Sequence, residues 1–376
     1  MAIMGYTLLA PEMVILWAGR QHYAARSLVK KHGENRRWTQ AHAFFLIMGG
    51  FTLHEGGKPV RVLVAKELEE LSSAGKIEWP TITEEEIADR SKGDYLSKTI
   101  VLSQTAWFIA QCIARGVYGL AVTELEVVTL AFAILTGVIY YFWWDKPLDV
   151  RCSVPVQLLK DNLNADHRRN PSTPIQVGTA TPNPPLTRIQ QFQAFRKHAC
   201  MQHGTLLGLG YVFIGFPLSR FWYGLGDMLV SRLPGKKALR VPTFYSPSDE
   251  IYDNGISFPL VICVAIIFGG IHCIAWSFHF ATLRERWAWR ISAILVSGLP
   301  TFLMVSMYLL SAINKIGGID GMDDAYDSMW RCILMPVGFL YFISRIILLI
   351  LPFVALRALL PGAYVQLDWV SFLPHI

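Results

Sequence analysis

The chain has 376 residues, of which 53% are hydrophobic and only 16% are charged, and its mean hydropathy is +0.36. A soluble domain has about 25% charged residues, so this composition argues against a soluble protein. The formal charge of +6 is modest and indicates basic cytosolic loops of a membrane protein rather than nucleic-acid binding. The six cysteines form no Cys-x-x-Cys pair, which argues against a zinc site or a disulfide framework.

The N-terminal part begins with an apolar stretch, residues 6–19, that contains Pro11 and Glu12. The first charge is Glu12, so no cleavable signal peptide is expected. A basic segment follows at 20–38, and the apolar residues 41–53 then form a block of about 13 residues. This block is too short to span a membrane and predicts a re-entrant or interfacial segment. Residues 1–54 are therefore expected to form an N-terminal anchor.

Residues 55–98 are polar and of mixed charge, as expected for a cytosolic linker region. Within them, Thr83 and Glu86 have the spacing of a capping box. This pattern predicts a helix that runs through Asp89 and ends near Gly93. A second capping box, Thr123 with Glu126, predicts the start of another helix.

Apolar blocks of about 17–25 residues, the length that crosses a bilayer, dominate residues 99–360. One shorter block and five clear spans are predicted, at 99–114, 125–144, 205–230, 258–280, 291–313 and 333–355. A proline-rich polar loop, 145–203, interrupts this bundle, and 361–376 form a C-terminal tail. The predicted fold class is all-α, a polytopic transmembrane bundle of six or seven spans plus the re-entrant or interfacial segment.

Orientation follows from the positions of lysine and arginine, which place 20–38, 145–203 and 284–290 in the cytosol. Seven spans with an external N-terminus satisfy this distribution if the first stretch crosses and 41–53 does not. Six spans with both termini in the cytosol are the alternative.

A polar stripe marks the predicted 99–114 helix and its end. Helical spacing places Gln104, Trp107, Gln111 and Arg115 on one face. The functional interpretation is a substrate-binding wall of a polar cavity, with Arg115 as an anion or diphosphate contact. The alternative is that the glutamines hydrogen-bond neighbouring helices while Arg115 reaches the membrane interface.

Four residues are candidate acid or base groups, because an ionisable side chain in or near a bilayer needs a reason to be there. Glu12 follows a proline in an apolar stretch, where a carboxyl group can serve as a general acid. His272 is a candidate proton relay, with a packed, hydrogen-bonded histidine as the alternative. Glu124 and Glu126 are expected to meet Arg115 at the same end of a helix pair.

An acidic run, Asp323, Asp324 and Asp327, has the Asp-Asp-x-x-Asp spacing that holds Mg²⁺ against a diphosphate. It is a candidate metal site, and magnesium is the only cofactor that the sequence suggests. The run stands alone in a loop on the external side, where acidic residues are ordinary.

Several short runs resemble a family of uncharacterised fungal polytopic membrane proteins. They are residues 89–94 (DRSKGD), 104–108 (QTAWF), 111–115 (QCIAR), 123–126 (TELE), 143–149 (WWDKPLD), 272–276 (HCIAW) and 374–376 (PHI). The resemblance covers most of the chain and implies a multi-pass membrane protein. It carries no established activity, so it assigns no catalytic role.

Three classes of function fit these patterns. The first is a non-redox membrane-embedded enzyme that acts on a lipid or isoprenoid, with the bilayer and a hydrophobic small molecule as its partners. The second is a channel or transporter for a small solute. The third is a membrane scaffold or regulatory protein whose cytosolic segments bind partners.

Overall fold

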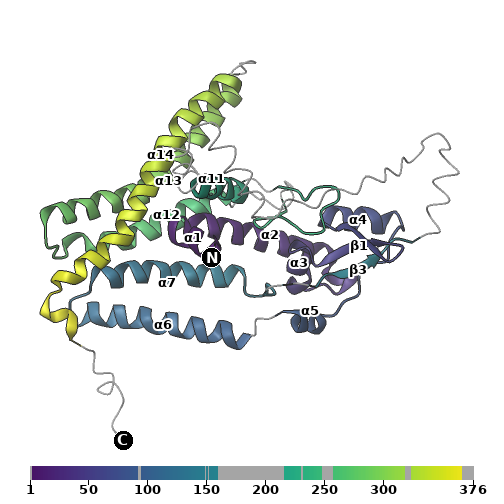
Figure 1. Cartoon of the computed structure of the whole chain (residues 1–376), viewed down its shortest axis with the longest axis horizontal. Coiled ribbons are helices and arrows are strands. Elements are labelled where there is room, and N and C mark those ends of the chain that lie inside the picture. Colours follow the sequence, from purple (N-terminus) through teal and green to yellow (C-terminus); the bar gives the residue numbers. More distant parts are fainter. Residues whose placement is uncertain are drawn as a thin grey trace, which may run out of the picture. The chain divides into compact units, whose positions relative to one another are not determined.

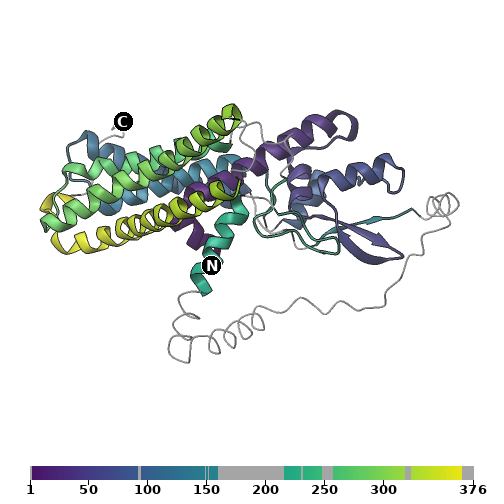
Figure 2. The same cartoon turned by 90° about the horizontal axis from the view of Figure 1, so that it is seen from above.

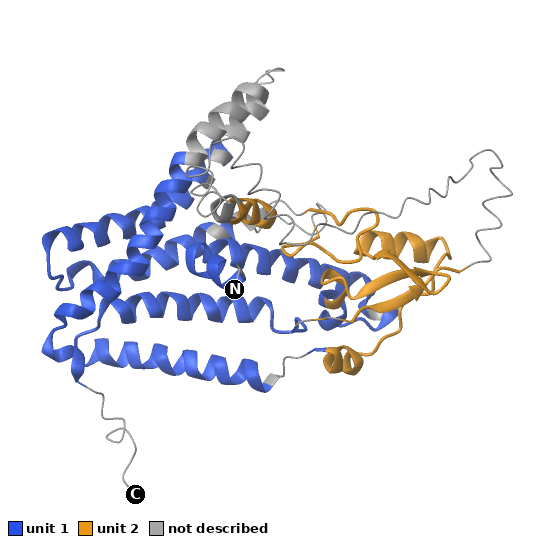
Figure 3. Cartoon of the chain, in the orientation of Figure 1, with its two compact units in different colours: residues 1–44, 91–149, 249–376 blue, residues 45–90, 150–248 orange. Residues whose placement is uncertain are grey.

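The structure is a computed structural model that describes residues 2–91, 95–148, 150, 152–159, 216–229, 232–247, 257–317 and 323–365. It is mostly helical (Figure 1), as the sequence predicts. The chain divides into two compact units (Figure 3). The helical unit comprises residues 1–44, 91–149 and 249–376, and the mixed unit comprises residues 45–90 and 150–248.

The helical unit is built mainly from long helices that run beside one another (Figure 2). Helix α12 packs against α2, α7 and α13, whereas α14 packs against α7 and α13 and α6 packs against α7. The elements are α1 (Ala2–Leu9), α2 (Pro11–Arg36), α6 (Tyr95–Val117), α7 (Glu124–Phe142), α12 (Ser257–His272), η3 (Cys273–Ser277), α13 (Leu283–Gly317), α14 (Asp323–Ala355), η4 (Leu356–Ala358) and η5 (Pro361–Tyr364).

Five helices each contribute apolar residues to the core of the helical unit. It includes Ile15 of α2, Val127 of α7, Phe268 of α12, Trp289 of α13 and Leu348 of α14. The indole nitrogen of Trp289 donates a hydrogen bond of 3.0 Å to the carbonyl of His272. This bond satisfies the polar atom of a fully buried tryptophan and fixes the end of α12 against α13.

The mixed unit contains a three-stranded sheet with the order β2-β1-β3. Strands β1 (Phe51–Glu55) and β2 (Lys58–Val62) form an antiparallel hairpin, whose turn residues Gly56 and Gly57 have φ of 58° and 79°. Positive φ at both positions favours glycine. Strand β3 (Val154–Gln157) joins β1 in parallel. Its described residues include the helices α4 (Ala65–Ser73), α5 (Glu84–Arg90) and α11 (Phe216–Leu229).

The sheet corrects two predictions. The all-α class is wrong in this unit. Residues 41–53 also do not form the single re-entrant or interfacial segment that was predicted, because they divide between a helix and a strand. Helix α3 (Gln40–Ile47) ends before Gly49, whose φ of 79° takes the chain out of the helical conformation, and β1 follows at Phe51. An apolar run of this length does not by itself distinguish a helix from a buried strand.

The predicted helices of the bundle correspond to helices in the described residues. The blocks 99–114, 125–144, 258–280, 291–313 and 333–355 lie mainly in α6, α7, α12 with η3, α13 and α14, and the second and third blocks extend two or three residues past their helices. Among the described residues, three stretches are long and apolar enough to cross a membrane, Leu96–Val117, Glu124–Phe142 and Pro336–Ala358, and a shorter apolar helix covers Ile262–Ser277. Helix α11 (Phe216–Leu229) lies in the second half of the predicted 205–230 span, and most of the 145–203 loop lies outside the described residues.

The basic segment 20–38, predicted to be a loop, is mainly helical. Helix α2 begins at Pro11 and continues through Arg36 without a break at Arg20. Gln21 and His22, inside this segment, are buried. Charge alone predicted a loop, but most of these residues favour a helix, and the buried face packs against other helices.

Both predicted capping boxes are present. The amide of Glu86 donates to the Thr83 hydroxyl at 3.2 Å, and the amide of Thr83 donates to the Glu86 carboxylate at 3.0 Å. The reciprocal bonds between Thr123 and Glu126 are 3.2 Å and 2.8 Å. These local patterns correctly predicted the starts of α5 and α7.

Two adjacent glycines of α12 give a matched test of helix packing. A Cβ atom on Gly269 would lie 2.8 Å from the Cα atom of Ser297 on α13, whereas one on Gly270 would meet nothing within 4 Å. We expect Gly269→Ala to destabilise the protein by about 1–3 kcal/mol through overpacking. Gly270→Ala should be neutral or stabilising, because alanine favours a helix. Thermal unfolding of both variants in detergent measures the difference, and equal midpoints would contradict the close packing of α12 on α13.

Candidate functional site

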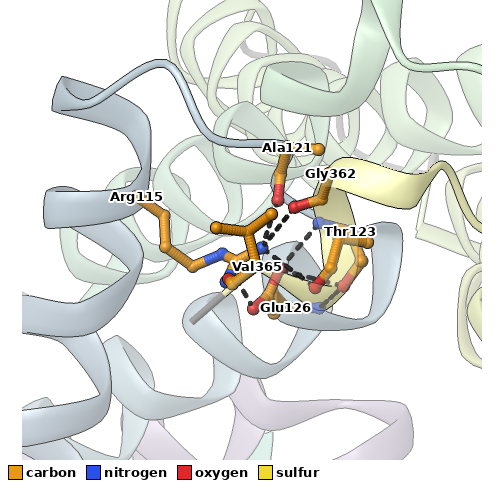
Figure 4. Close-up of polar contacts among 7 residues, drawn as sticks. Arg115, Ala121, Thr123, Glu126, Gly362 and Val365 are labelled. Carbon is orange, nitrogen blue, oxygen red and sulfur yellow. Dashed lines mark hydrogen bonds and ion pairs between the residues drawn. The ribbon is translucent and has the colours of Figure 1, made fainter. Parts of the chain in front are cut away.

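The polar cluster around Arg115 lies where α6 ends and α7 begins (Figure 4). Arg115 is buried and donates hydrogen bonds to the carbonyls of Val365 at 2.8 Å and Ala121 at 2.6 Å. It also donates to the carbonyl of Ala363 at 3.2 Å. Its Nε atom forms an ion pair with Glu126 at 3.4 Å. The sequence correctly placed Arg115 and Glu126 together.

Arg115 holds two backbone segments together, and we call this set of contacts the clamp. The two terminal nitrogens of Arg115 bind carbonyls from the α6–α7 turn and from the segment at 362–365. Glu126 is also occupied, since its carboxylate accepts the amide of Thr123 in the capping box. Both terminal nitrogens of Arg115 are therefore already bound to backbone carbonyls, and its Nε atom lies 3.4 Å from the Glu126 carboxylate.

The other members of the predicted stripe are not gathered around Arg115. Gln104 is exposed, the Trp107 side chain is 52% exposed, and Gln111 is half-buried. Helical spacing correctly placed them on one helix but did not show what that face meets. The exposure of Gln104 and Trp107 contradicts the expectation that they face a cavity between helices.

A second polar cluster, Glu12 with Tyr341 and Arg345, is buried in the helical unit. Glu12 is 3% exposed and Arg345 is 1% exposed. A terminal guanidinium nitrogen of Arg345 lies 2.6 Å from a carboxylate oxygen of Glu12. The Tyr341 hydroxyl donates to the other Glu12 oxygen and accepts a hydrogen bond from Arg345 Nε at 2.7 Å. We call this set the buried triad.

Local structure positions each member of the buried triad. Glu12 lies in the first turn of α2, directly after Pro11, where the helix dipole favours a negative charge. Tyr341 and Arg345 are four residues apart on α14 and therefore share a face. The Arg345 guanidinium carbon also lies 3.8 Å from the centre of the Phe268 ring on α12. The triad thus ties three helices together.

One nitrogen of the buried triad, Nη1 of Arg345, has no hydrogen-bond partner among the described residues. Leaving a buried donor unpaired costs about 1–3 kcal/mol, and more when the group is charged. A buried, unpaired guanidinium nitrogen is a ready donor for the oxygen of a carboxylate or a phosphate. Both terminal nitrogens of Arg115, by contrast, are hydrogen-bonded to backbone carbonyls.

The sequence identified Glu12 as a candidate but missed Tyr341 and Arg345. A signal was present, because Arg345 lies within the apolar block 333–355. A charged residue inside a predicted span is by itself a candidate functional residue.

His272 is fully buried beside the triad. Its Nδ1 atom lies 2.7 Å from the carbonyl oxygen of Phe268, and the two rings are 4.5 Å apart. Phe268 in turn lies against Arg345. This arrangement matches the alternative prediction of a packed, hydrogen-bonded histidine, while Glu124 is buried separately at the start of α7.

The acidic run lies at the start of α14, which begins at Asp323. The side chains of Asp323, Asp324 and Asp327 lie outside the described residues, so the magnesium site stays a prediction. Within the described part of the chain, no group of three metal-binding side chains is present.

A third polar cluster surrounds the C-terminal end of α7. His22 lies 3.0 Å from the Phe142 carbonyl, and the Lys98 ammonium donates to the Trp144 carbonyl at 2.6 Å. Lys146 donates to the Gln21 side chain at 2.8 Å. Cationic and donor groups suit this position because the carbonyls at a helix end carry partial negative charge.

Lys146 has an altered acidity in this cluster. Its ammonium lies 3.8 Å from the centre of the Trp143 ring and 4.7 Å from that of Trp17. Desolvation, together with the smaller effect of the nearby Lys98 charge, lowers the pKa of Lys146 from 10.5 to about 7. Desolvation likewise lowers the pKa of His22 below its usual 6.5.

Comparison with known proteins gives a match to a protein family. Residues 6–166 are similar to a family of unknown function, DUF8562. No curated protein and no solved structure matches the chain. The matched region contains Glu12, Arg115 and Glu126 but not the α14 members of the buried triad.

The clamp predicts a structural role for Arg115. Arg115→Ala should lower the stability of the protein by about 2–4 kcal/mol, because it leaves Glu126 without its ion pair and several carbonyls without a donor. It should also make residues 361–365 more sensitive to limited proteolysis. Arg115→Lys should have an intermediate effect, since one ammonium group cannot reach the same set of carbonyls. Unchanged melting and unchanged proteolysis in Arg115→Ala would exclude the clamp.

The pKa of Lys146 predicts a pH-dependent stability. Between about pH 7 and 10.5 the unfolded chain holds a proton on Lys146 that the folded chain has released. Stability should therefore rise with pH across this window, and Lys146→Met should reduce the slope. Melting temperatures at pH 7 and pH 9.5 measure it, with Lys66→Met, at an exposed lysine of α4, as the control. Equal slopes in the wild type and Lys146→Met would contradict the lowered pKa of Lys146.

Proposed function

We propose that the chain is a multi-pass membrane protein whose helical unit binds an anionic lipid or isoprenoid and exchanges a proton with it, without a redox cofactor. The six or seven spans, and the fungal family that the sequence resembles, belong to this proposal. Its main support is the buried triad with the unpaired Nη1 atom of Arg345.

The location of the triad favours a role in binding or chemistry. Tyr341 and Arg345 lie within Pro336–Ala358, a stretch long and apolar enough to cross a membrane. Charged groups at that depth are costly, and in membrane proteins they commonly mark substrate or proton pathways. A long-chain lipid reaches such a site from the bilayer with its apolar tail still in an apolar environment.

Each member of the triad has a distinct proposed role. Arg345 binds the anionic group of the substrate through Nη1, in a charge-assisted hydrogen bond. The Tyr341 hydroxyl gives or takes the proton, and the Glu12 carboxylate, to which it is hydrogen-bonded, accepts or returns it. The Tyr341–Glu12 pair takes one proton from the substrate and returns one to it, so a cycle leaves the protein unchanged and exchanges or relocates one hydrogen of the substrate.

An enzyme fits these observations better than a channel. A channel needs a continuous polar path, and the stripe that was its candidate wall has Gln104 and Trp107 on an exposed face. The triad is a compact set of three side chains. It suits one bound group rather than a file of ions or solutes.

The test uses the full chain in phosphatidylcholine nanodiscs, with oleate and farnesyl phosphate as anionic probes and oleyl alcohol and farnesol as neutral controls. Native mass spectrometry should detect binding of an anionic probe and not of its neutral control. The triple variant Glu12→Leu, Tyr341→Phe, Arg345→Met removes all three polar groups together and so leaves no buried charge unpaired. It should remain folded and lose binding at least about tenfold, equivalent to ~1.4 kcal/mol.

Two further variants separate the proposed roles. In D2O the wild type should incorporate deuterium into the bound probe, whereas Tyr341→Phe should bind the probe without incorporating it, as judged by mass spectrometry of the extracted lipids. Arg357→Met, at an exposed arginine that pairs with Glu285, should behave like the wild type. The proposal is wrong if the anionic probes do not bind, or if the triple variant binds them as the wild type does.

A further inference from the structure

A surface groove in the mixed unit has no part in the proposed chemistry. Its cavity volume is about 470 Å³, within the ~300–1,000 Å³ typical of ligand-binding pockets. One wall is strand β3 with Leu159, and the other is the segment 78–82 with Glu86 and Arg90 of α5. All of these residues belong to one compact unit.

Two extended segments diverge to form the groove. Ile77 makes an isolated antiparallel bridge with Leu158, and the amide of Leu159 donates to the Lys76 carbonyl at 2.8 Å. Because the bridge is isolated, the two segments do not continue as a pair of strands. Beyond Ile77 the chain turns through Pro80 toward α5, and the groove lies between it and β3.

The lining of the groove combines an aromatic and apolar surface with acidic groups. Its apolar residues are Trp79, Pro80, Ile82, Val154, Pro155, Val156 and Leu159. Two carboxylates, Glu78 and Glu86, and one guanidinium, Arg90, are the charged groups. The neighbouring Glu84 and Glu85 are exposed and add to the negative charge. This field favours a basic ligand.

Strand addition is not the way in which this groove would bind a ligand. Strand β3 is at the edge of the sheet, but Pro155 has no N–H to donate, and an edge proline opposes pairing with a further strand. Recognition must therefore come from side chains. A proline-containing segment suits an aromatic groove, because its extended conformation is formed before binding and loses little entropy.

We infer that this groove binds an extended, proline-containing basic peptide segment of a partner protein. The prolines pack on Trp79 and Pro155, and a basic side chain of the peptide pairs with Glu78. Glu78 is exposed, and the structure gives it no ion pair with a described residue. The inference is independent of the lipid chemistry proposed for the helical unit.

Fluorescence anisotropy of the full chain in detergent tests the inference. The probe is a fluorescein-labelled ten-residue peptide with two prolines and two arginines, and the control peptide has glutamates in place of the arginines. The wild type should bind the basic peptide and not the acidic one. Glu78→Arg should weaken binding about tenfold, or ~1.4 kcal/mol, through charge reversal. Trp79→Ala should weaken it at least as much by removing the aromatic surface.

Glu70→Arg, which reverses an exposed carboxylate on α4 outside the groove, is the matched control and should bind like the wild type. It also shows whether the peptide responds only to net charge. Failure of the basic peptide to bind the intact chain would overturn the inference, including the case in which another part of this chain fills the groove. Equal loss of binding in Glu70→Arg and Glu78→Arg would also overturn it, because the interaction would then be non-specific.

Discussion

The ion pair between Glu12 and Arg345 brings together the first long helix and the last one in the helical unit. Its two charges are almost completely buried, and the Tyr341 hydroxyl connects them through two further hydrogen bonds. Removing two charges from water is costly, and the attraction between them repays that cost only when the remaining polar atoms are also satisfied. Here one guanidinium nitrogen is not satisfied. The pair therefore joins two helices and also leaves Nη1 of Arg345 as a donor to which an anion could bind.

The polar groups of the helical unit divide into two kinds. Arg115, Glu126 and the groups around the end of α7 satisfy backbone atoms that helix ends leave unpaired. These contacts connect segments of the chain. Tyr341 and Arg345 of the buried triad instead lie along the side of α14, where the helix backbone already pairs its own polar atoms. A charged side chain in that position is not needed to complete a helix end, which is why we assign the proposed chemistry to it.

Local sequence patterns predicted the local structure well. Apolar blocks gave most of the long helices, and the spacing of Thr83 with Glu86 and Thr123 with Glu126 gave two helix starts. The sheet was missed because β3 joins β1 from about a hundred residues further along the chain, and Gly49 ends a helix within what reads as one apolar block. No local pattern records such a pairing.

The candidate site was predicted only in part, for a similar reason. Glu12 was identified from its apolar surroundings, but its partner is 333 residues away, and sequence alone does not show which charge in a distant block faces it. The polar stripe on α6 shows a second limit of prediction from sequence. Periodicity assigned Gln104 and Trp107 to one face of α6, but whether that face meets a helix or the surroundings depends on the packing of the whole unit.

A double-mutant cycle on the buried ion pair tests the account most directly. Glu12→Leu, Arg345→Met and the double variant would be compared with the wild type by unfolding in detergent. Each single change leaves one charge buried without its partner and should cost about 3–5 kcal/mol, whereas the double variant should cost much less than the sum of the two. Additive losses, or single variants as stable as the wild type, would contradict the pairing of Glu12 with Arg345 and the site built on it.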